Sequence, residues 1–445
     1  MSTEPSVARS LETYSRAGEV IPGWTQLISR RASQFANGVS PIYAKSAKGS
    51  HFIDLDGNEY IDWVCAVGAV ILGFADDVVD QAVKEQIDRG SLYTLNHPAE
   101  IELAEELIET VPSAEMVRYT KGGGEACVVA VRIARGTTGR DKVLFCGYHG
   151  WHDWYQAANY LCGPDDGEYP FAGIEPIGVP KVLAGTAIPF SYGDLEMLER
   201  LLEEHKGEVA CVMMEPLRSS IPEPGYLEGV KELAHANDAI LIFDEVSCGF
   251  RISVGGVQEF LGVTPDMTAF GKAISNGYPM GAVVGTKRVM EPASRMFISS
   301  SYWSDNTGLV AALTTIRELK KKNVPARLKE IGDRLRDEFN RLLVETDLGG
   351  ECPEFLLGLG VTPDLPDESL RPQVNTLFIQ EMSKRGIYCF AGLKPCYAHG
   401  EDDIRLTVEA AREVFSIIKQ GLDANTIDDL LECDIRKDPF KRLVR

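Results

Sequence analysis

The amino-acid sequence predicts an α/β protein with a mostly parallel sheet that is covered by helices on both faces. Short apolar segments alternate with helical patterns through the middle of the chain, as is typical of doubly wound parallel sheets. Some of these segments are apolar at every position, as in "ILIF" (240–243), which indicates strands buried on both faces. The chain of 445 residues is 44% hydrophobic and is long enough for two or three domains.

The expected elements follow one another along the chain. The segment "HFIDLDGNEYIDW" predicts two short strands around a turn at Asp56 and Gly57, and helical patterns follow at 76–89 and 98–111. In the alternating region we expect strands at 116–120, 142–147, 209–214, 240–245, 267–270 and 281–285, with helices at 124–139, 194–204 and 229–237.

Two long charged helices, at 309–322 and 325–345, lead out of this region. A last α/β unit is then expected from strands at 355–361 and 386–390 and from helices at 373–385 and 403–422. These patterns place a domain boundary near 325–335.

The composition excludes two classes of partner. Lys and Arg number 45 against 66 Asp and Glu, and the resulting net charge of -21 repels both nucleic acid and anionic membranes. The ten cysteines lie between Cys65 and Cys433 without a Cys-x-x-Cys pair, which predicts a reduced, cytoplasmic protein. The N-terminus has no apolar signal-peptide core, and the longest apolar or glycine run (67–75) is too short to span a bilayer.

The glycine-rich segment "TKGGGEA" lies between an expected strand and an expected helix. Gly122, Gly123, Gly124 and the amide of Glu125 are suited to bind a phosphate, because glycines allow close approach and a helix N-terminus favours an anion. A tight strand-to-helix turn is the alternative. Cys127 stands where a dinucleotide fingerprint requires glycine, and no Walker sequence follows, so a phosphate without a nucleotide is expected.

Polar residues with possible chemical roles follow other expected strands. Lys272 follows "MTAFG" among small residues, where partial desolvation would lower its pKa and make the amine nucleophilic, although a structural pair with an acid is the alternative. Asp244 and Glu245 end a strand and point to opposite faces, so they cannot share one task. In "CGYHGWHDW", Tyr148 is suited to stack on a flat ring and His149 to orient it or to relay protons.

Two further candidates are weaker. Glu215 in "MMEPL" is another carboxylate at a strand end, with a role in fixing a loop as its alternative. His149 and His152 lack a partner at ligand spacing, so no metal site is expected there. A phosphate cradle, a stacking aromatic, a buried lysine and a carboxylate on one sheet edge together describe pyridoxal 5'-phosphate (PLP) as the ligand.

At these motifs the sequence resembles the class-III, fold-type-I PLP-dependent aminotransferases, and most closely the branch that contains glutamate-1-semialdehyde aminomutase. The resemblance covers about residues 20–420. It implies that Asp244 in "IFDEV" pairs with the pyridine nitrogen, that Lys272 in "FGKAISNGYPMGA" forms the Schiff base, and that "YHG" and "GGGEA" supply the stacking tyrosine and the phosphate cup. It also implies a large PLP domain at 76–328 and a small α/β domain from 1–75 and 329–445.

The sequence departs from the family pattern at several positions. The phosphate cup has "KGGG" in place of Asn-Ser-Gly-Thr, and Tyr302 stands where the family threonine reaches the phosphate of the neighbouring subunit, with Ser300 or Ser301 as substitutes. Val67 replaces a substrate-side tryptophan of the aminomutase branch. Arg30, beside Arg31, falls where that branch binds a substrate carboxylate.

The resemblance implies a catalytic cycle and leaves three functions open. Lys272 would act as general base, Val246 would pack on the ring, and Glu245 would hold a nearby loop. The segment 162–173 is either a mobile lid or an ordinary surface loop. We expect an aminotransferase for an aldehyde, ketone or keto acid, with an aminomutase as the alternative and a non-catalytic PLP-fold protein as the third possibility. The family also implies a homodimer with active sites at the interface.

Overall fold

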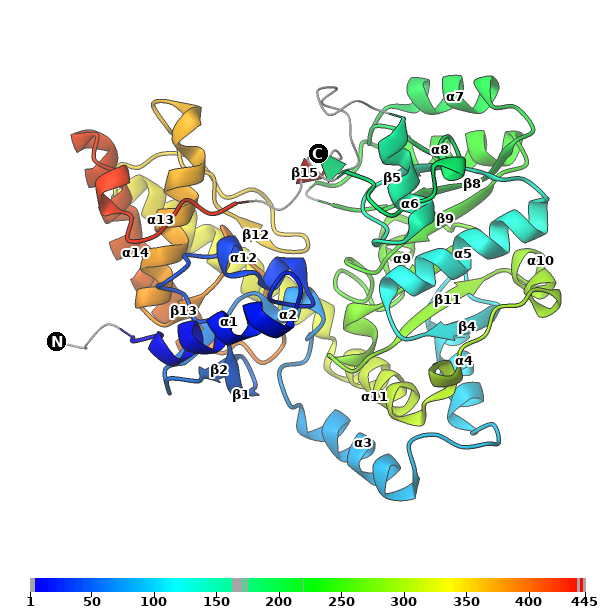
Figure 1. The fold of residues 1–445 in the computed structure, drawn as a ribbon, viewed down its shortest axis with the longest axis horizontal. Coiled ribbons are helices and arrows are strands. Elements are labelled where there is room, and N and C mark those ends of the chain that lie inside the picture. Colours follow the sequence, from blue (N-terminus) through cyan, green and yellow to red (C-terminus); the bar gives the residue numbers. More distant parts are fainter. Residues whose placement is uncertain (1–4, 162–170, 173–174, 219, 438–440, 443–445) are drawn as a thin grey trace. The chain divides into compact units, whose positions relative to one another are not determined.

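The computed structural model describes residues 5–161, 171–172, 175–218, 220–437 and 441–442. The chain divides into two compact units, a smaller one of residues 1–76 and 326–439 and a larger one of residues 77–325 and 440–445 (Figure 1). Most of the segment 162–173, considered above as a lid or surface loop, lies outside the described residues. No helix in the described ranges is long and apolar enough to cross a membrane.

The larger unit contains a seven-stranded sheet with the strand order β4-β11-β10-β9-β8-β5-β7. Its strands are β4 (Met116–Thr120), β5 (Lys142–Cys146), β7 (Ala187–Pro189), β8 (Val209–Met214), β9 (Ile240–Asp244), β10 (Met267–Phe270) and β11 (Gly281–Gly285). Strands β10, β9, β8, β5 and β7 are parallel, whereas β11 is antiparallel to both β10 and β4. The expectation of a mostly parallel α/β sheet is confirmed, with β11 as the reversed strand.

Helices cover both faces of this sheet. Helix α5 (Gly123–Thr138) packs on one face, and α7 (Leu195–Glu204) and α8 (Tyr226–Ala236) pack on the other (Figure 1). Alternate residues of each strand divide between the two cores, so that Ile242 contributes to the α5 side and Leu241 and Phe243 to the α7–α8 side. Strands that are buried on both faces explain why the sequence is apolar at successive positions.

The remaining helices of the larger unit lie before, between and after these strands. Helix α11 packs against α3 and α4, as the ribbon shows (Figure 1). The bounds are α3 (Asp77–Arg89), α4 (Ala99–Thr110), α6 (Asp153–Gln156), α9 (Val257–Leu261), α10 (Lys287–Met290) and α11 (Asn306–Lys322). The expected helix at 229–237 begins three residues earlier, after Gly225, whose positive φ of 86° ends the preceding turn.

The smaller unit combines a four-stranded sheet with long helices. Strands β1 (Ala44–Lys48), β2 (His51–Asp54) and β3 (Glu59–Asp62) form an antiparallel meander, and β13 (Ile387–Tyr388) adds in parallel to β3. The helices are α1 (Ala8–Val20), α2 (Cys65–Gly68), α12 (Val324–Glu345), α13 (Arg371–Lys384) and α14 (Glu401–Ala424). Helix α1 and strand β1 were not expected from the sequence.

The expected strand at 355–361 is reduced to two residues, β12 (Leu359–Gly360), which pairs with β14 (Gly392–Leu393). Phe355 is instead buried in the helical core of the smaller unit, where its ring faces Gly332 of α12. Packing of this aromatic side chain against a helix therefore outweighs the strand pattern of the segment.

Glu245 anchors the short helix α9 to the end of strand β9. Its buried carboxylate accepts hydrogen bonds from the backbone N–H groups of Val257, at 2.7 Å, and Gln258, at 3.3 Å, and from the Gln258 side chain at 3.1 Å. Burial raises the pKa of this carboxyl group to about 7, against the opposing effect of the three N–H donors. Glu245 thus has the loop-holding role that was expected of it.

We expect stability to depend on pH through Glu245. A carboxyl group whose pKa rises from 4.5 to about 7 on folding stabilises the native state below pH 4.5, and this stabilisation is lost as pH rises through 7. The thermal midpoint of the wild-type protein should therefore fall relative to that of Glu245→Gln between pH 5 and pH 8. The exposed Glu203→Gln change is the control. A difference in thermal midpoint between the wild type and Glu245→Gln that stays constant from pH 5 to pH 8 would contradict the expectation.

Gly332 tests the packing of the smaller unit. A Cβ at this position would lie 2.1 Å from Cγ of Phe355, so Gly332→Ala should destabilise the protein by about 1–3 kcal/mol. This is opposite to the gain of about 1 kcal/mol that alanine brings inside a helix. Gly360→Ala, where a Cβ meets no described atom within 4 Å, serves as the control in thermal unfolding. Equal stability of Gly332→Ala and the wild type would rule out the packing described.

Candidate active site

The parallel strands bring most of the expected site residues to one edge of the large sheet. Strands β10, β9, β8 and β5 are neighbours and point the same way, so their carboxyl ends lie side by side. The residues at or just beyond these ends are Lys272, Asp244, Glu215, Tyr148 and His149.

Asp244 is a buried carboxylate at the end of β9, and it is 3% exposed. Its Oδ1 accepts the backbone N–H of Val246 at 3.0 Å. Its Oδ2 accepts Nδ1–H of His149 at 2.7 Å and the thiol of Cys127, from α5, at 3.4 Å. A carboxylate offers about four acceptor positions, so one is left for a further cationic donor.

His149 is held in place by its contact with Asp244. The ring is fully buried, lies parallel to Trp154 at a centroid distance of 6.3 Å, and meets Tyr155 edge-on. Its other nitrogen, Nε2, has no hydrogen-bond partner among the described residues. Sγ of Cys127, a nitrogen of His149 and an oxygen of Asp244 lie within 4.8 Å of one another, and the hydrogen bonds to Oδ2 account for this grouping.

The glycine-rich segment becomes the N-terminus of helix α5. Gly122 is the N-cap residue and no side chain caps the helix, so the first backbone N–H groups remain available to an anion. A Cβ on Gly122 would meet no described atom within 4 Å, whereas a Cβ on Gly123 would lie 2.4 Å from Cγ1 of Val246. Gly124 lies beside His152. Lys121, the first residue of "KGGG", forms an ion pair with Asp305 at 2.9 Å.

Three of the motifs meet at Gly123. A Cβ on Gly271, the residue before Lys272, would lie 3.0 Å from Cα of Gly123 and 3.3 Å from Cγ1 of Val246. The lysine segment, the glycine turn and the loop after Asp244 are therefore in van der Waals contact. Only glycine fits at these two positions without moving Val246.

Lys272 has an unusual backbone and a close hydrogen-bond partner. Its φ of 46° is in the left-handed region, which non-glycine residues rarely adopt and which often marks a functional site. Its ammonium donates to Oγ of Ser247 at 2.7 Å. Ser247 was missed by the sequence reasoning because it lies beyond the end of β9, where side chains no longer alternate between faces.

Glu215 fixes the turn that carries Tyr148. Its Oε2 accepts the backbone N–H of Tyr148 and a guanidinium N–H of Arg218, both at 3.0 Å. Gly147 has a φ of 122°, and a Cβ there would lie 2.7 Å from Oε2 of Glu215, so this position requires glycine. The Tyr148 ring is half-buried and meets Tyr155 edge-on at 6.1 Å. Glu215 thus contacts the backbone of the aromatic turn, and the role of Arg218 was not expected.

The segment with Ser301 and Tyr302 forms a short 3-10 helix, Ser301–Ser304. It lies near the start of α5, because Nε1 of Trp303 donates to Oε2 of Glu125 at 3.3 Å. Both Ser301 and Tyr302 are exposed, and Tyr302 is 68% exposed.

Arg30 and Val67, the expected substrate-binding residues, both line one cavity of about 500 Å³ in the smaller unit. Aromatic side chains such as Trp24, Tyr43 and Tyr388 form much of its wall, and Arg30 and Asp62 are the charged lining residues. Within the described part of the chain, the Arg30 side chain has no hydrogen bond or ion pair. Its guanidinium is therefore available to an anion in this cavity.

The backbone at Val67 has an uncommon conformation. Cys65, Ala66 and Val67 have φ values of 49°, 51° and 60°, so Cys65–Gly68 is a left-handed turn built largely from non-glycine residues. Oδ1 of the buried Asp62 accepts the backbone N–H groups of Val64 and Cys65 at 2.7 and 3.1 Å and holds the start of the turn. Burial raises the pKa of Asp62 to about 6.

Known proteins resemble this chain over nearly its whole length. A 3-aminobutyryl-CoA aminotransferase of Cloacimonas acidaminovorans is 34% identical, with 95% of this chain and 100% of the relative covered. A glutamate-1-semialdehyde 2,1-aminomutase of Syntrophobacter fumaroxidans is 35% identical, with 93% and 98% covered. An omega-transaminase crystal structure from Sphaerobacter thermophilus matches with a TM-score of 0.82 at 29% identity, with 93% and 98% covered.

The family described as aminotransferase class-III matches residues 34–399. The resemblance noted in the sequence is thereby confirmed, as is the α/β fold class. The chain therefore belongs to the class-III aminotransferases, PLP-dependent enzymes of fold type I that transfer amino groups.

Proposed function

We propose that this aminotransferase uses Lys272 to bond its cofactor and to move the proton, with Asp244 as the partner of the pyridine nitrogen. The observation that carries the proposal is the close packing at Gly123. It puts the lysine segment, the anion-binding helix terminus and the loop after Asp244 within contact distance of one another.

The chain's own residues fit PLP in three respects. The uncapped start of α5 suits the phosphate group, because its N–H groups and positive dipole end favour an anion. Val246 and the half-buried ring of Tyr148 suit the two sides of a flat ring. Asp244 keeps one acceptor position for a protonated ring nitrogen.

Each residue then has a distinct task. When bound, PLP delocalises the negative charge that develops where the substrate loses its proton. The Lys272 amine takes up that proton and returns it, and Ser247 at 2.7 Å orients the amine. The Asp244 carboxylate would pair with a protonated ring nitrogen, while His149 orients the carboxylate. Glu215 positions Tyr148 through its backbone N–H.

We propose further that one substrate carries a carboxylate that binds to Arg30. The cation lines a largely aromatic cavity of about 500 Å³, large enough for a small carboxylic acid with an apolar part. Arg30 makes no side-chain hydrogen bond or ion pair within the described residues, and a carboxylate would supply both. Val67 lines the same cavity, where its small side chain leaves room for a substituent.

An aminomutase is the second candidate, because a relative that is 35% identical over most of the chain has that name. The two reactions differ in whether the amino group leaves the carbon skeleton of its donor. Amine-loaded enzyme is incubated with separate aldehydes, ketones and keto acids. Release of an aminated acceptor supports transfer, and product from one amino-aldehyde or diamino skeleton alone supports the aminomutase.

We propose a cytoplasmic homodimer with active sites at the interface. The support is the family resemblance together with apolar side chains exposed around 297–302, where Phe297 is 85% and Tyr302 68% exposed. This segment includes Ser301 and Tyr302, which the resemblance directs to the phosphate of the neighbouring subunit.

The Asp244→Asn change tests the cofactor assignment. Loss of the negative charge removes the group that holds the ring nitrogen protonated, so kcat should fall by about 10²-fold or more. Glu245→Gln, the adjacent carboxylate on the opposite side of the strand, should keep near-wild-type kcat. Bound PLP is measured for each variant, and wild-type turnover by Asp244→Asn with full PLP content would overturn the assignment.

The Arg30→Ala change tests the carboxylate site. Loss of a charged hydrogen bond of about 1.5–3 kcal/mol should raise KM for the carboxylate substrate by about 10- to 100-fold with little change in kcat. Arg30→Lys should restore part of the affinity. Arg31→Ala is the comparison. A rise in KM for Arg31→Ala without one for Arg30→Ala would show that Arg31, and not Arg30, binds the carboxylate.

A further inference from the structure

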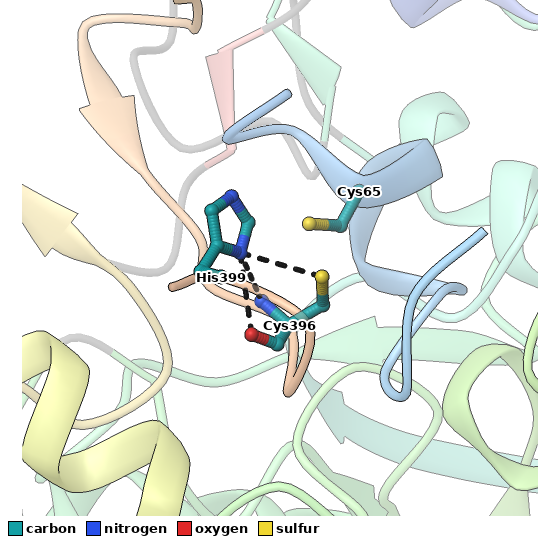
Figure 2. A group of neighbouring side chains, drawn as sticks. All are labelled: Cys65, Cys396 and His399. Carbon is teal, nitrogen blue, oxygen red and sulfur yellow. Dashed lines mark hydrogen bonds between the residues drawn. The ribbon is translucent and has the colours of Figure 1, made fainter. Parts of the chain in front are cut away.

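Two cysteines and a histidine form a buried cluster in the smaller unit, outside the candidate active site. Sγ of Cys65, Sγ of Cys396 and a ring nitrogen of His399 all lie within 4.8 Å of one another (Figure 2). The residues come from two segments more than 300 positions apart, and each is at most 1% exposed. No disulfide joins any cysteine in the described part of the chain.

The Cys396–His399 turn presents two of the donor atoms together. Nδ1 of His399 lies 3.3 Å from Sγ of Cys396 and accepts the backbone N–H of Cys396 at 3.0 Å (Figure 2). Nδ1 also lies 3.2 Å from the carbonyl oxygen of Cys396. Binding of a metal requires His399 in its neutral form, with the lone pair of the ligating ring nitrogen directed at the ion. The Cys-x-x-His spacing resembles the short ligand spacings of zinc sites.

Cys65 brings the third donor from the left-handed turn. Its single S–H is shared between the backbone carbonyls of Asp62 and Lys394, whose oxygens lie 3.3 and 3.1 Å from the sulfur. These contacts hold the sulfur beside the Cys396–His399 turn, and they put two carbonyl oxygens at the edge of the cluster.

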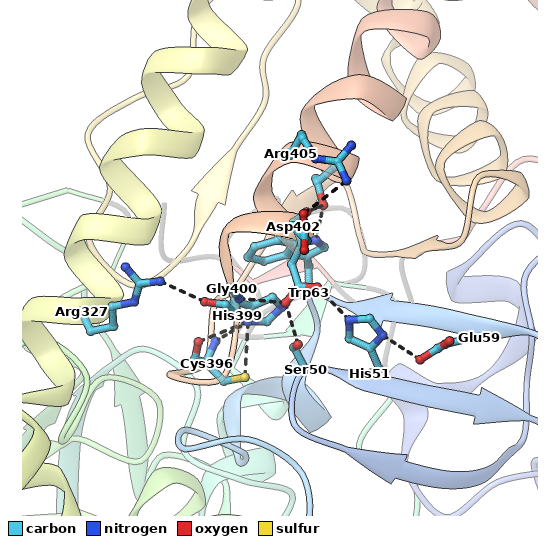
Figure 3. Close-up of polar contacts among 12 residues, drawn as sticks. Ser50, His51, Glu59, Trp63, Arg327, Cys396, His399, Gly400, Asp402 and Arg405 are labelled. Carbon is cyan, nitrogen blue, oxygen red and sulfur yellow. Dashed lines mark hydrogen bonds and ion pairs between the residues drawn. The ribbon is translucent and has the colours of Figure 1, made fainter.

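The surrounding contacts fix the orientation of the histidine. Its ring stacks on Trp63 at a centroid distance of 3.8 Å, and Nε1 of Trp63 donates to Thr407 at 2.9 Å. The His399 carbonyl accepts from Arg327, while the next backbone N–H, of Gly400, donates to Asp403 (Figure 3). A ligand set needs such support to keep its geometry, and here the support is present before any ion binds.

We propose that Cys65, Cys396 and His399 form a binding site for a thiophilic divalent cation, with Zn²⁺ as the ion that suits two thiolates and an imidazole. Binding forms two metal–sulfur bonds and one metal–nitrogen bond. The two protons that the three groups hold leave to solvent. The charges of the ion and the two thiolates then sum to zero, which is what a fully buried site requires.

The ion would act as a cross-link between two loops. It would join the turn at 65–68 to the loop at 394–400, within the smaller unit. Ala66 and Val67 of that turn line the cavity that contains Arg30, so the ion would stabilise the wall of this cavity. The site itself does not depend on the proposed amino-transfer function.

The test measures zinc in the full-length, PLP-loaded protein. The protein is stripped with a chelator under reducing conditions, reloaded with zinc and freed of excess ion by gel filtration. We expect about one zinc per chain, an X-ray absorption spectrum with two sulfur neighbours, and a higher thermal midpoint with zinc than without. Cys65→Ala and Cys396→Ala should each lower zinc retention at least tenfold, whereas the buried cysteine change Cys352→Ala should keep it.

Three outcomes would overturn the proposal. The first is that the wild type retains no more zinc than Cys65→Ala, and the second is a zinc spectrum without sulfur neighbours. The third is that only eight of the ten thiols are titrated after denaturation with a chelator, and that a reductant restores the other two. The last outcome would identify a disulfide at the cluster instead. If the alanine variants do not fold, the wild-type stoichiometry and spectrum still decide. Zinc content is independent of turnover, so failure here and failure of the proposed function remain distinguishable.

Discussion

The buried carboxylate of Asp244 is the interaction on which the larger unit's site depends. It ends a strand whose five residues are all buried, where a charge is stable only if polar hydrogens surround it. Those hydrogens come from His149 after β5, from Cys127 in α5 and from the backbone after β9. One charge therefore holds three elements around the same point.

The neighbouring carboxylate organises the opposite side of the strand. Successive side chains of β9 point to opposite faces, so Glu245 turns away from Asp244 and accepts the N–H groups at the start of α9. Two adjacent acids thus anchor two different elements. The apolar strand ends in "DE" because each face of the sheet needs its own polar anchor at that edge.

The sequence predicts the residues whose places follow from repeating geometry. Asp244, Lys272 and the glycine turn could be predicted because parallel strands put their carboxyl ends on one edge. The direction of β11 could not be predicted, since a buried strand has the same apolar pattern whether it is parallel or antiparallel to its neighbours. Ser247 and Arg218 lie in loops beyond strand ends, where only the folded backbone determines which side chains meet.

The left-handed turn at Cys65 shows why the shape of the cavity around Arg30 could not be predicted from the sequence. Left-handed backbone costs about 1–2 kcal/mol for each non-glycine residue. The residue types in "CAVG" do not predict this conformation. Asp62 offsets part of this cost by accepting two backbone N–H groups, and the Cys65 thiol adds one hydrogen bond that two carbonyls share. Because the turn sets where Val67 lies, the cavity's shape depends on these buried contacts as much as on its lining side chains. The shape of the proposed substrate site is therefore determined partly by Cys65, which is not among the residues that line the cavity.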